Sequence, residues 1–359
     1  MRQKIRKTRR NFVKTSVAGA AAIAGVPRVV TASRTNREVI VGENDYQFRV
    51  IHDWPQLPDE YSWQTTHGVA VDSEDNLHVI QMGHRDREHH PTIFVFDPAG
   101  KFVRAFGEQY YGGGHGIEIR REGSEDFIYI AGYQHIKTIA KLTMQGEVVW
   151  EQHAPMQSGV YKPGEDVDRT RRRARDRFAP TNFAFADDGG FWLADGYGSF
   201  RVHRYDKEAN WVSCFGGPGQ GQGTFDTTHG LWLDKRSEEP QLVVTDRAHH
   251  TLQTFTTDGV YKETISGFEM PANVDIRGKL MLVPELLGSI SLLDEKKRFV
   301  ARLNTGRPRL DELPNLRKQP ENWKAGEFVH PHDACFSQTG RIHVAEWMET
   351  GRVSLLVPV

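Results

Sequence analysis

One short sequence element recurs six times along the chain and carries a histidine in four of its copies. The copies are Thr66-His67-Gly68-Val69, Gly114-His115-Gly116-Ile117, Pro180-Thr181-Asn182-Phe183, Thr228-His229-Gly230-Leu231, Pro271-Ala272-Asn273-Val274 and Pro331-His332-Asp333-Ala334. The shared position thus holds His67, His115, His229 and His332, out of 16 histidines in the whole chain. Imidazole nitrogens bind Zn, Cu, Fe or Ni, and three of them with an open coordination position make a catalytic zinc site. The residues also admit a second interpretation, in which the histidines only fill a channel and bond to water and backbone.

The spacing of the copies predicts the structure that positions these histidines. The shared position falls at residues 67, 115, 181, 229, 272 and 332, and short alternating apolar runs broken by Gly, Asp, Asn and Pro lie between the copies. A repeat of about 40 to 50 residues with such runs is typical of propeller blades. Hairpins are clearest at residues 93–103 and 252–265, so four strands per unit and six units predict an all-β, six-bladed propeller. Because the innermost strand of each blade lines the central channel, the histidines should converge there and form a central-channel metal site.

The ring should be closed by both ends of the folded chain and interrupted by two insertions. Strands at 46–51 and 352–356 are expected to share a blade. The first insertion carries an arginine cluster, formed by Arg169, Arg171, Arg172, Arg173, Arg175 and Arg177. Such a cluster could bind an anion, but interleaved aspartates favour an ordinary solvated loop. The second, at residues 304–327, holds three prolines and many charges, which predicts a long surface loop.

The overall composition limits the classes of partner that the protein is expected to bind. Lys plus Arg (46) nearly cancels Asp plus Glu (47), so no broad electrostatic field draws the surface to nucleic acid or anionic lipid. We therefore expect a monomer that binds a small molecule or peptide, with no nucleic-acid partner. Only Cys214 and Cys335 are present, which allows at most one disulfide and excludes a cysteine-rich zinc site.

Residues 1–32 are predicted to be a signal peptide, followed by the propeller at 33–359. A positive region precedes a weakly apolar stretch at 15–26, and residues 30–32 offer a small-residue cleavage site. The segment around Arg9-Arg10, with Val13 where Leu is commoner, resembles a twin-arginine export signal. The apolar stretch is too short for a membrane span of about 20 residues. We expect the twin-arginine translocation machinery as a partner, a bacterial periplasmic or otherwise exported location, and no stable membrane anchor after cleavage.

From about residue 84 onward the chain resembles the peptidyl-α-hydroxyglycine α-amidating lyase domain (peptidylamidoglycolate lyase), within the wider NHL-repeat group. The likeness is carried by Asp195-Gly196-Tyr197-Gly198, by the Gly-rich segment 215–225 with His229-Gly230, and by Val244-Thr245-Asp246-Arg247. Pro331-His332-Asp333, followed by Ile342-His343-Val344-Ala345-Glu346, is similar to the last metal-ligand motif of that family.

The resemblance implies a role for individual residues. It implies that His115, His229 and His332 hold the catalytic zinc, or another divalent metal, and it leaves room for a structural calcium ion. His67 matches no ligand and is expected to have a structural use. Tyr197 matches a general base, Arg247 an active-site arginine, and Asp333 the residue after the last ligand, which we assign to the catalytic set. The substrate-binding arginine should fall within residues 83–87, where we choose Arg85 over Arg87. Tyrosine ordinarily deprotonates near about pH 10, so a tyrosine base needs a neighbouring metal or cation.

The resemblance also implies a reaction. The family splits a peptidyl or N-acyl α-hydroxyglycine into an amide and glyoxylate, by proton removal from the hydroxyl and cleavage of the C–N bond. The chain departs from the animal enzymes in its two cysteines, which fall in different blades, and no segment resembles the monooxygenase that makes the hydroxyglycine. The alternative is a non-catalytic NHL-repeat propeller that binds a peptide or glycan, because the fold serves both uses. A propeller lactone hydrolase fits poorly, since such sites use carboxylates and Asn around calcium.

Overall fold

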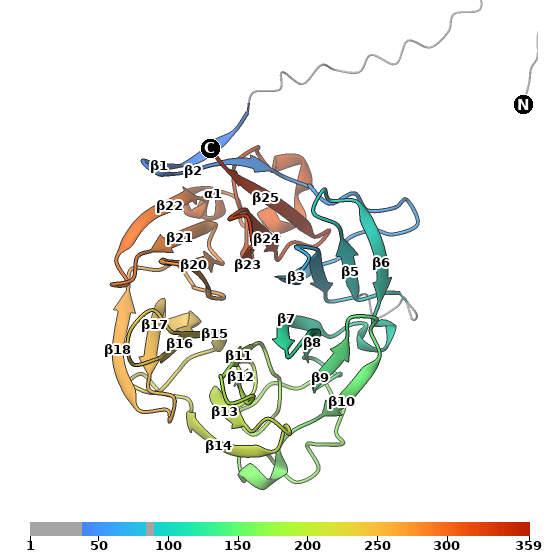
Figure 1. Cartoon of the computed structure of the whole chain (residues 1–359), viewed down its shortest axis with the longest axis vertical. Helices are drawn as coiled ribbons and strands as arrows, with labels where there is room; N and C mark the ends of the chain where they lie inside the picture. Colours follow the sequence, from blue (N-terminus) through green and yellow to red (C-terminus); the bar gives the residue numbers. More distant parts are fainter. Residues whose placement is uncertain (1–37, 84–89) are drawn as a thin grey trace, which may run out of the picture. The chain divides into compact units, whose positions relative to one another are not determined.

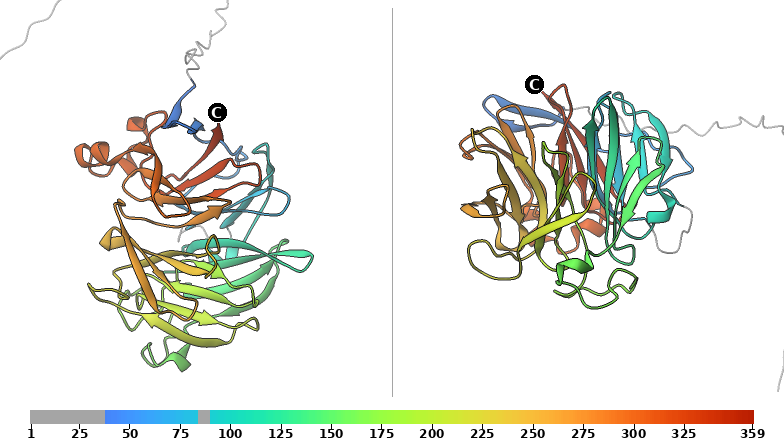
Figure 2. Two further views of the ribbon diagram at one scale, coloured as in Figure 1. Left: turned by 60° about the vertical axis from the view of Figure 1, so that its left-hand side comes forward. Right: turned by 60° about the horizontal axis from the view of Figure 1, so that its bottom comes forward.

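Short strands joined by tight turns build six antiparallel sheets around a central axis (Figure 1). The chain was analysed as a computed structural model, which describes residues 38–83 and 90–359. The expected signal peptide and Arg85 therefore lie outside the described residues. The predicted six-bladed propeller is confirmed. Figure 2 shows its blades as twisted sheets from two further sides.

Five blades each consist of four strands in chain order. Blade one holds β3 (Thr66–Val71), β4 (Leu77–Gln81), β5 (Ile93–Phe96) and β6 (Phe102–Phe106). Blade two holds β7 (Gly114–Glu122), β8 (Glu125–Gly132), β9 (Thr138–Thr143) and β10 (Val148–Gln152). Blade three holds β11 (Phe183–Phe185), β12 (Phe191–Asp195), β13 (Arg201–Tyr205) and β14 (Trp211–Gly216). Blade four holds β15 (Thr228–Asp234), β16 (Gln241–Asp246), β17 (Thr251–Phe255) and β18 (Tyr261–Ser266). Blade five holds β19 (Asp275–Arg277), β20 (Leu280–Glu285), β21 (Ser289–Leu293) and β22 (Phe299–Thr305).

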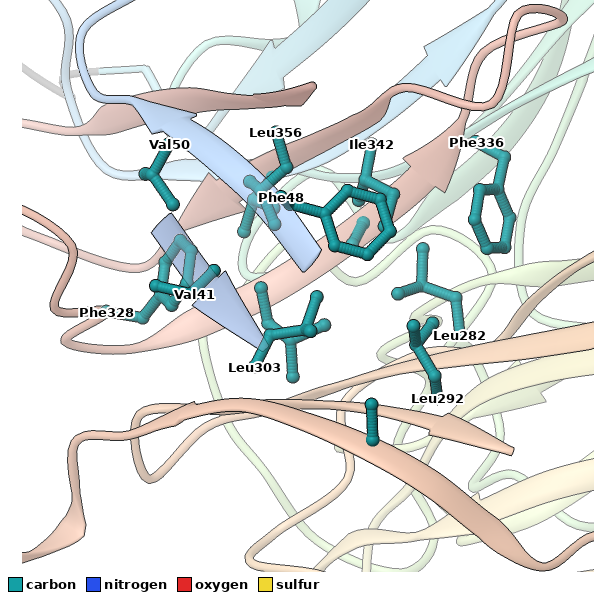
Figure 3. Packing of buried hydrophobic residues seen from close by; sticks show 14 residues of the cluster. Val41, Phe48, Val50, Leu282, Leu292, Leu303, Phe328, Phe336, Ile342 and Leu356 are labelled. Carbon is teal, nitrogen blue, oxygen red and sulfur yellow. The ribbon is translucent and has the colours of Figure 1, made fainter. Parts of the chain in front are cut away.

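Blade six joins the two ends of the folded chain, as expected. Its order is β23 (Pro331–Phe336), β24 (Ile342–Glu346), β25 (Arg352–Pro358), β2 (Tyr46–Ile51) and β1 (Ile40–Glu43), so it has a fifth strand that the repeat does not predict. Val50 of β2 is the partner of Leu356 of β25. Figure 3 shows the apolar core beneath this seam, where Phe48 and Val50 lie with Leu292 and Leu303 of blade five. Burial of these side chains against the neighbouring blade stabilises the closed ring.

The turns follow from aspartate and glycine at fixed positions. Asp97 Oδ1 accepts hydrogen bonds from the backbone N–H of Ala99 and of Lys101, at 2.9 Å each. Gly100 takes a φ of 85° between them, and Gly259 takes a φ of 84° in the predicted hairpin of blade four. A side-chain carboxylate that satisfies turn N–H groups, followed by glycine in the left-handed region, defines a tight hairpin.

Both insertions are ordered by packing. In the first, buried Glu165 accepts from Lys137 Nζ (2.6 Å), Arg177 Nη1 (2.8 Å) and the backbone N–H of Phe178 (3.1 Å). The second was expected to be a long surface loop, and it also contains α1 (Arg307–Glu312) and two 3-10 turns that the sequence did not predict. Its apolar side chains pack against Val329 and Met348 on either side of β23 and β24. Further 3-10 turns are Glu108–Tyr110, Met156–Ser158 and Arg247–His249.

Cys214 and Cys335 are both free thiols. Among the described residues, none of the helices has the length and apolar character to cross a membrane.

Candidate metal centre and active site

A β-bulge turns each repeat histidine out of its sheet. In blade one the register passes from Thr66 to Gly68, so that His67 between them has no partner on β4. The same shift in register occurs at His115, His229 and His332. A bulge leaves the extra residue unpaired and re-aims its side chain. All four histidines are thereby directed into the channel, where they are buried.

Glycine follows the histidine where a neighbouring blade comes very close. A Cβ atom at Gly116 would lie 2.1 Å from the carbonyl oxygen of Thr181, and one at Gly230 would lie 2.4 Å from Cα of Asn273. Both distances are far below van der Waals contact, so a larger residue would push the blades apart. The close approach brings backbone carbonyls within reach of the histidine rings.

Each of the four imidazoles donates one ring proton to a backbone carbonyl. Three use the carbonyl of the corresponding position in the next blade: His115 with Thr181 (Nδ1 to O, 3.0 Å), His229 with Ala272 (2.6 Å) and His332 with His67 (2.8 Å). His67 instead uses Thr65 of its own blade, at 3.1 Å. Because a carbonyl can only accept, Nδ1 carries the proton and Nε2 keeps a lone pair. This is the tautomer found in metal-ligating histidines.

The Nε2 lone pairs converge on the channel axis. Nε2 of His115 and Nε2 of His229 lie 3.2 Å apart. Nε2 of His332 is buried and has no hydrogen-bond partner among the described residues. Two nitrogens that share a tetrahedral zinc ion at about 2.0–2.1 Å lie roughly 3.3 Å apart. The cavity between the rings measures about 10 Å³, the space of one water or small ion. The donor set and its spacing therefore fit one divalent metal ion.

Two sets of three histidines are candidates for the metal ligands, and both sets include His115 and His332. The ligand nitrogens of His67, His115 and His332 lie within 4.8 Å of one another, so distance alone admits His67 as the third ligand. Nε2 of His67 has the Tyr133 hydroxyl 3.5 Å away, and Nε2 of His229 has the Tyr197 hydroxyl 3.1 Å away and faces Nε2 of His115 at 3.2 Å. The hydrogen bond of His229 to the next blade also matches those of His115 and His332. The structure therefore brings all four histidines together and leaves His67 and His229 as alternative third ligands beside His115 and His332.

Burial keeps these imidazoles neutral. Desolvation lowers the pKa of His67 to about 3, and it lowers the pKa values of His115, His229 and His332 well below the ordinary 6.5. The positive charge of Arg247 lowers the pKa of all four further. Neutral imidazole is the form that binds metal, so the rings are ready to coordinate without losing a proton.

A tight loop after β12 positions Tyr197. Asp195 accepts hydrogen bonds from the backbone N–H groups of Ala179 and Ser199, at 2.7 Å each, and from the Tyr161 hydroxyl at 2.9 Å. The N–H of Tyr197 donates to the carbonyl of Ala179 at 3.2 Å. Since Tyr161 and Ala179 belong to the first insertion, that insertion sets the place of Tyr197.

The Tyr197 hydroxyl contacts two of the histidines and one arginine. Its oxygen lies 3.1 Å from Nε2 of His229 and 3.4 Å from Nε2 of His115. It also accepts a hydrogen bond from Nη2 of Arg247 at 2.7 Å. A guanidinium that donates to a phenol oxygen stabilises negative charge on that oxygen. Tyr197 is therefore placed to accept a proton directly beside the candidate metal centre.

A cavity of about 170 Å³ opens beside these groups. Its lining includes Tyr197, Arg247 and His332, as expected, together with Tyr133, Arg173 and Trp347, and none of the described residues that line it is a carboxylate. The last three lie in connections outside the repeated element, so the periodicity gave no reason to select them. The arginine cluster of the first insertion was the only sequence signal for Arg173.

Asp333 does not line this cavity. Its Oδ1 accepts from Asn273 Nδ2 (2.6 Å) and from the backbone N–H of Ala334 (2.9 Å), and its Oδ2 accepts from the N–H of Val69 (2.9 Å). Burial raises the pKa of Asp333 to about 7. These bonds tie blade six to blades one and five immediately next to His332, so Asp333 stands further along the channel than the groups around Tyr197.

Beyond the histidines the channel is lined by oxygen atoms. Burial raises the pKa of Glu118 well above its ordinary 4.5, and the side chain accepts from Asn182 Nδ2 at 3.0 Å. Oδ1 of Asn182 and Oδ1 of Asn273 are buried without a hydrogen-bond partner among the described residues. Carboxyl and amide oxygens are the ligands that calcium prefers. This stretch therefore has the donor chemistry for a hard cation.

No protein-family model matches the chain. Peptidylglycine alpha-amidating monooxygenase of Rattus norvegicus is 22% identical over 332 residues, which cover 82% of this chain and 30% of that protein. The peptidyl-glycine alpha-amidating monooxygenase of Mus musculus is 21% identical over 340 residues, covering 84% and 31%. The chain thus spans less than a third of the length of these curated relatives, and its similarity to the amidating enzymes is distant.

Solved propeller structures are similar in fold. A streptogramin B lyase structure has a TM-score of 0.54 at 12% identity and covers 86% of this chain and 97% of its own. A gluconolactonase from Xanthomonas campestris also has a TM-score of 0.54, at 13% identity, covering 86% and 89%. A virginiamycin B lyase from Staphylococcus aureus has a TM-score of 0.50, at 13% identity, covering 87% and 100%. The chain is therefore a six-bladed β-propeller with distant sequence similarity to peptidylglycine alpha-amidating monooxygenases.

Proposed function

We propose that this protein is a metal-dependent lyase that cleaves the C–N bond of a peptidyl or N-acyl α-hydroxyglycine to give an amide and glyoxylate. One observation carries the proposal. A tyrosine hydroxyl, held by an arginine at 2.7 Å, lies within 3.4 Å of two histidine nitrogens that face each other as metal ligands do. The distant similarity to the amidating enzymes supports the same reaction.

Nε2 of His115, of His229 and of His332 would hold the metal, with zinc as the ion that this donor set suits best. When bound, the ion would polarise the substrate hydroxyl and make it more acidic. The oxygen atoms of Glu118, Asp333, Asn182 and Asn273 support a structural calcium ion further along the channel.

The protein's own residues supply the proton transfers and the binding. Tyr197 removes the proton of the substrate hydroxyl, and Arg247 stabilises the tyrosine oxygen by its hydrogen bond. The electrons of the O–H bond form the new carbonyl, the C–N bond breaks, and its electron pair moves to nitrogen. The proton held by Tyr197 is then delivered to that nitrogen, which completes the amide and leaves glyoxylate. Arg85 is proposed to contact the substrate as well.

We further propose that the protein is exported through the twin-arginine translocation machinery and works as a monomer on a small-molecule or peptide substrate. Export of an already folded chain is compatible with loading a metal before translocation. The near balance of charge supports a site that selects its substrate locally rather than by a broad surface field.

Elemental analysis and an activity assay test the proposal together. The purified protein should contain one transition metal ion per chain and should release glyoxylate from an N-acyl α-hydroxyglycine. Removal of the metal by a chelator should stop the release, and zinc should restore it. A protein that purifies with full metal but releases no glyoxylate would favour the non-catalytic propeller, and a protein that never binds metal would overturn both the site and the lyase.

A further inference from the structure

Two arginines, Arg173 and Arg247, line the cavity beside Tyr197, and the proposed mechanism gives no role to Arg173. Arg247 is engaged with the Tyr197 hydroxyl at 2.7 Å. Arg173 also lines the cavity, and its Cζ lies 4.3 Å from the ring centre of Tyr197 and 5.9 Å from that of Tyr133. Within residues 38–83 and 90–359, no carboxylate lines the cavity to neutralise either arginine.

Arg173 differs in this respect from its neighbours in the arginine cluster. Arg177 is buried and bonded to Glu165 (2.8 Å) and Asp168 (2.6 Å). The Cζ of Arg175 lies 3.3 Å from the ring centre of Phe200, outside the cavity lining. Among the described residues, Arg173 has no ion pair and no hydrogen bond, and it is exposed to solvent. Its donors are therefore free to meet a ligand.

The insertion holds Arg173 in this place. Four residues further on, Arg177 joins the buried network of Glu165 and Lys137, where Lys137 Nζ lies 2.6 Å from a Glu165 oxygen. The tyrosine ring under Arg173 supplies a second fixed contact, since a guanidinium stacks favourably on an aromatic face. Stacking leaves the edge of the guanidinium open, and that edge carries the paired N–H groups that match a carboxylate.

Arg173 and Arg247 both line this cavity, so two guanidinium groups face the same space. Two neighbouring positive charges attract an anion into that space.

We propose that Arg173 is the residue that binds the carboxylate of the substrate, and that this cavity selects small ligands in which a carboxylate lies next to the reacting carbon. The inference rests on the proposed function for the identity of that carbon, but not for the recognition of the carboxylate. The cavity volume of about 170 Å³ is below the roughly 300–1,000 Å³ that encloses a drug-sized ligand, so only the reacting end enters and the acyl or peptide part extends outward.

Binding of an unreactive ligand tests the inference. The metal-loaded protein is titrated by calorimetry with an N-acylglycine, which has the carboxylate but lacks the hydroxyl, and with the corresponding N-acylglycinamide, which is uncharged. The wild-type protein should prefer the carboxylate. Arg173→Gln should weaken carboxylate binding by about 10- to 100-fold, as for loss of a charge-assisted hydrogen bond, and leave amide binding unchanged. Arg173→Lys should fall between the two, because it keeps the charge and loses the paired geometry.

The matched control is Arg172→Gln on the same exposed loop, since Arg172 does not line the cavity. It should bind both ligands as the wild type does, and thermal unfolding should show all variants folded. Equal carboxylate affinity in Arg173→Gln and wild type would overturn the inference, as would equal wild-type affinity for acid and amide. If the wild type binds carboxylates through Arg173 but releases no glyoxylate, only the proposed function fails. If it releases glyoxylate and Arg173→Gln leaves the KM unchanged, only this inference fails.

Discussion

Nε2 of His115 and Nε2 of His229 face each other at 3.2 Å, although each ring already donates its Nδ1 proton to a carbonyl of the next blade. Two lone pairs at this distance repel each other unless a cation lies between them. Protonation is opposed by burial, which lowers both pKa values well below 6.5. The proposed metal ion would remove the repulsion without adding a proton, and the hydrogen bonds to the carbonyls would hold both rings in place to bind it.

The metal ligands can be separated from their neighbour by substitution. His115→Ala, His229→Ala and His332→Ala should each lose bound metal, because each removes one of three ligands, while circular dichroism should still show the β fold. His67→Ala should retain most of the metal, because His67 is not one of the three proposed ligands. Metal content is measured by elemental analysis of the purified variants. Full stoichiometric metal in all three ligand variants would exclude this site.

Tyr197→Phe tests the base. The variant keeps the ring beneath Arg173 and removes only the hydroxyl, so metal content and thermal stability should be preserved. Turnover of an N-acyl α-hydroxyglycine should fall by about 100-fold or more, the usual contribution of a positioned proton-transfer group. If this variant kept a near-normal kcat while the histidine variants were inactive, the metal site would stand and another group would have to be the base.

Gly116→Ala tests the close approach of blades two and three. The added Cβ would lie 2.1 Å from Thr181 O, the acceptor of the His115 Nδ1 proton. We expect a loss of about 1–3 kcal/mol in the free energy of unfolding and weaker metal binding, measured by denaturant titration and metal competition. Gly221→Ala is the control, because its nearest atom is 4.0 Å away. Equal effects of the two substitutions would show that the contact can relax.

His203 should give the stability a pH dependence. Burial, with a smaller contribution from Arg201, lowers its pKa from 6.5 to about 3. Between these values the unfolded chain binds a proton that the folded protein excludes, so the free energy of unfolding decreases as the pH falls from 6.5 toward 3. One such group contributes about 1.4 kcal/mol per pH unit. His203→Gln should therefore have a shallower pH dependence than wild type in this window, and an unchanged slope would contradict the assignment.

Arg9→Lys combined with Arg10→Lys tests export. The paired guanidinium groups are expected to be read by the translocation receptor, which charge alone does not satisfy. The double variant should accumulate inside the cell, as measured by fractionation and immunoblotting, whereas Lys4→Arg should be exported normally. Unchanged delivery of the double variant would count against this route.

The fold could be predicted because every blade buries its apolar side chains in the same way. A single four-stranded sheet cannot bury both faces, so the apolar alternation recurs at each blade and reveals the period. The same period places His115, His229 and His332 at one position of the repeat. Residues at one repeat position come from different blades and converge on the central axis of a propeller.

The other residues of the site could not be predicted from the spacing of the sequence repeats. Arg173 and Trp347 come from connections whose paths depend on packing against distant segments, such as the bond between Lys137 and Glu165. The β-bulge that leaves His67 without a partner on β4 cannot be recognised from the alternation of apolar and polar residues in the sequence. The short helix α1 was missed because charged residues and prolines dominate its segment, while its apolar contacts are made with blade six.

The contact between blades six and one would couple loading of the proposed metal to the lifetime of the folded ring. His332 reaches the His67 carbonyl where these two blades meet. In the proposed site, His332 would therefore join the other ligands only when the ring closes, a slow step for contacts so far apart in the sequence. The bound ion would then link blades two, four and six. Separating blade six from blade one would require a metal–ligand bond to break, so loading would slow unfolding in addition to stabilising the folded state at equilibrium.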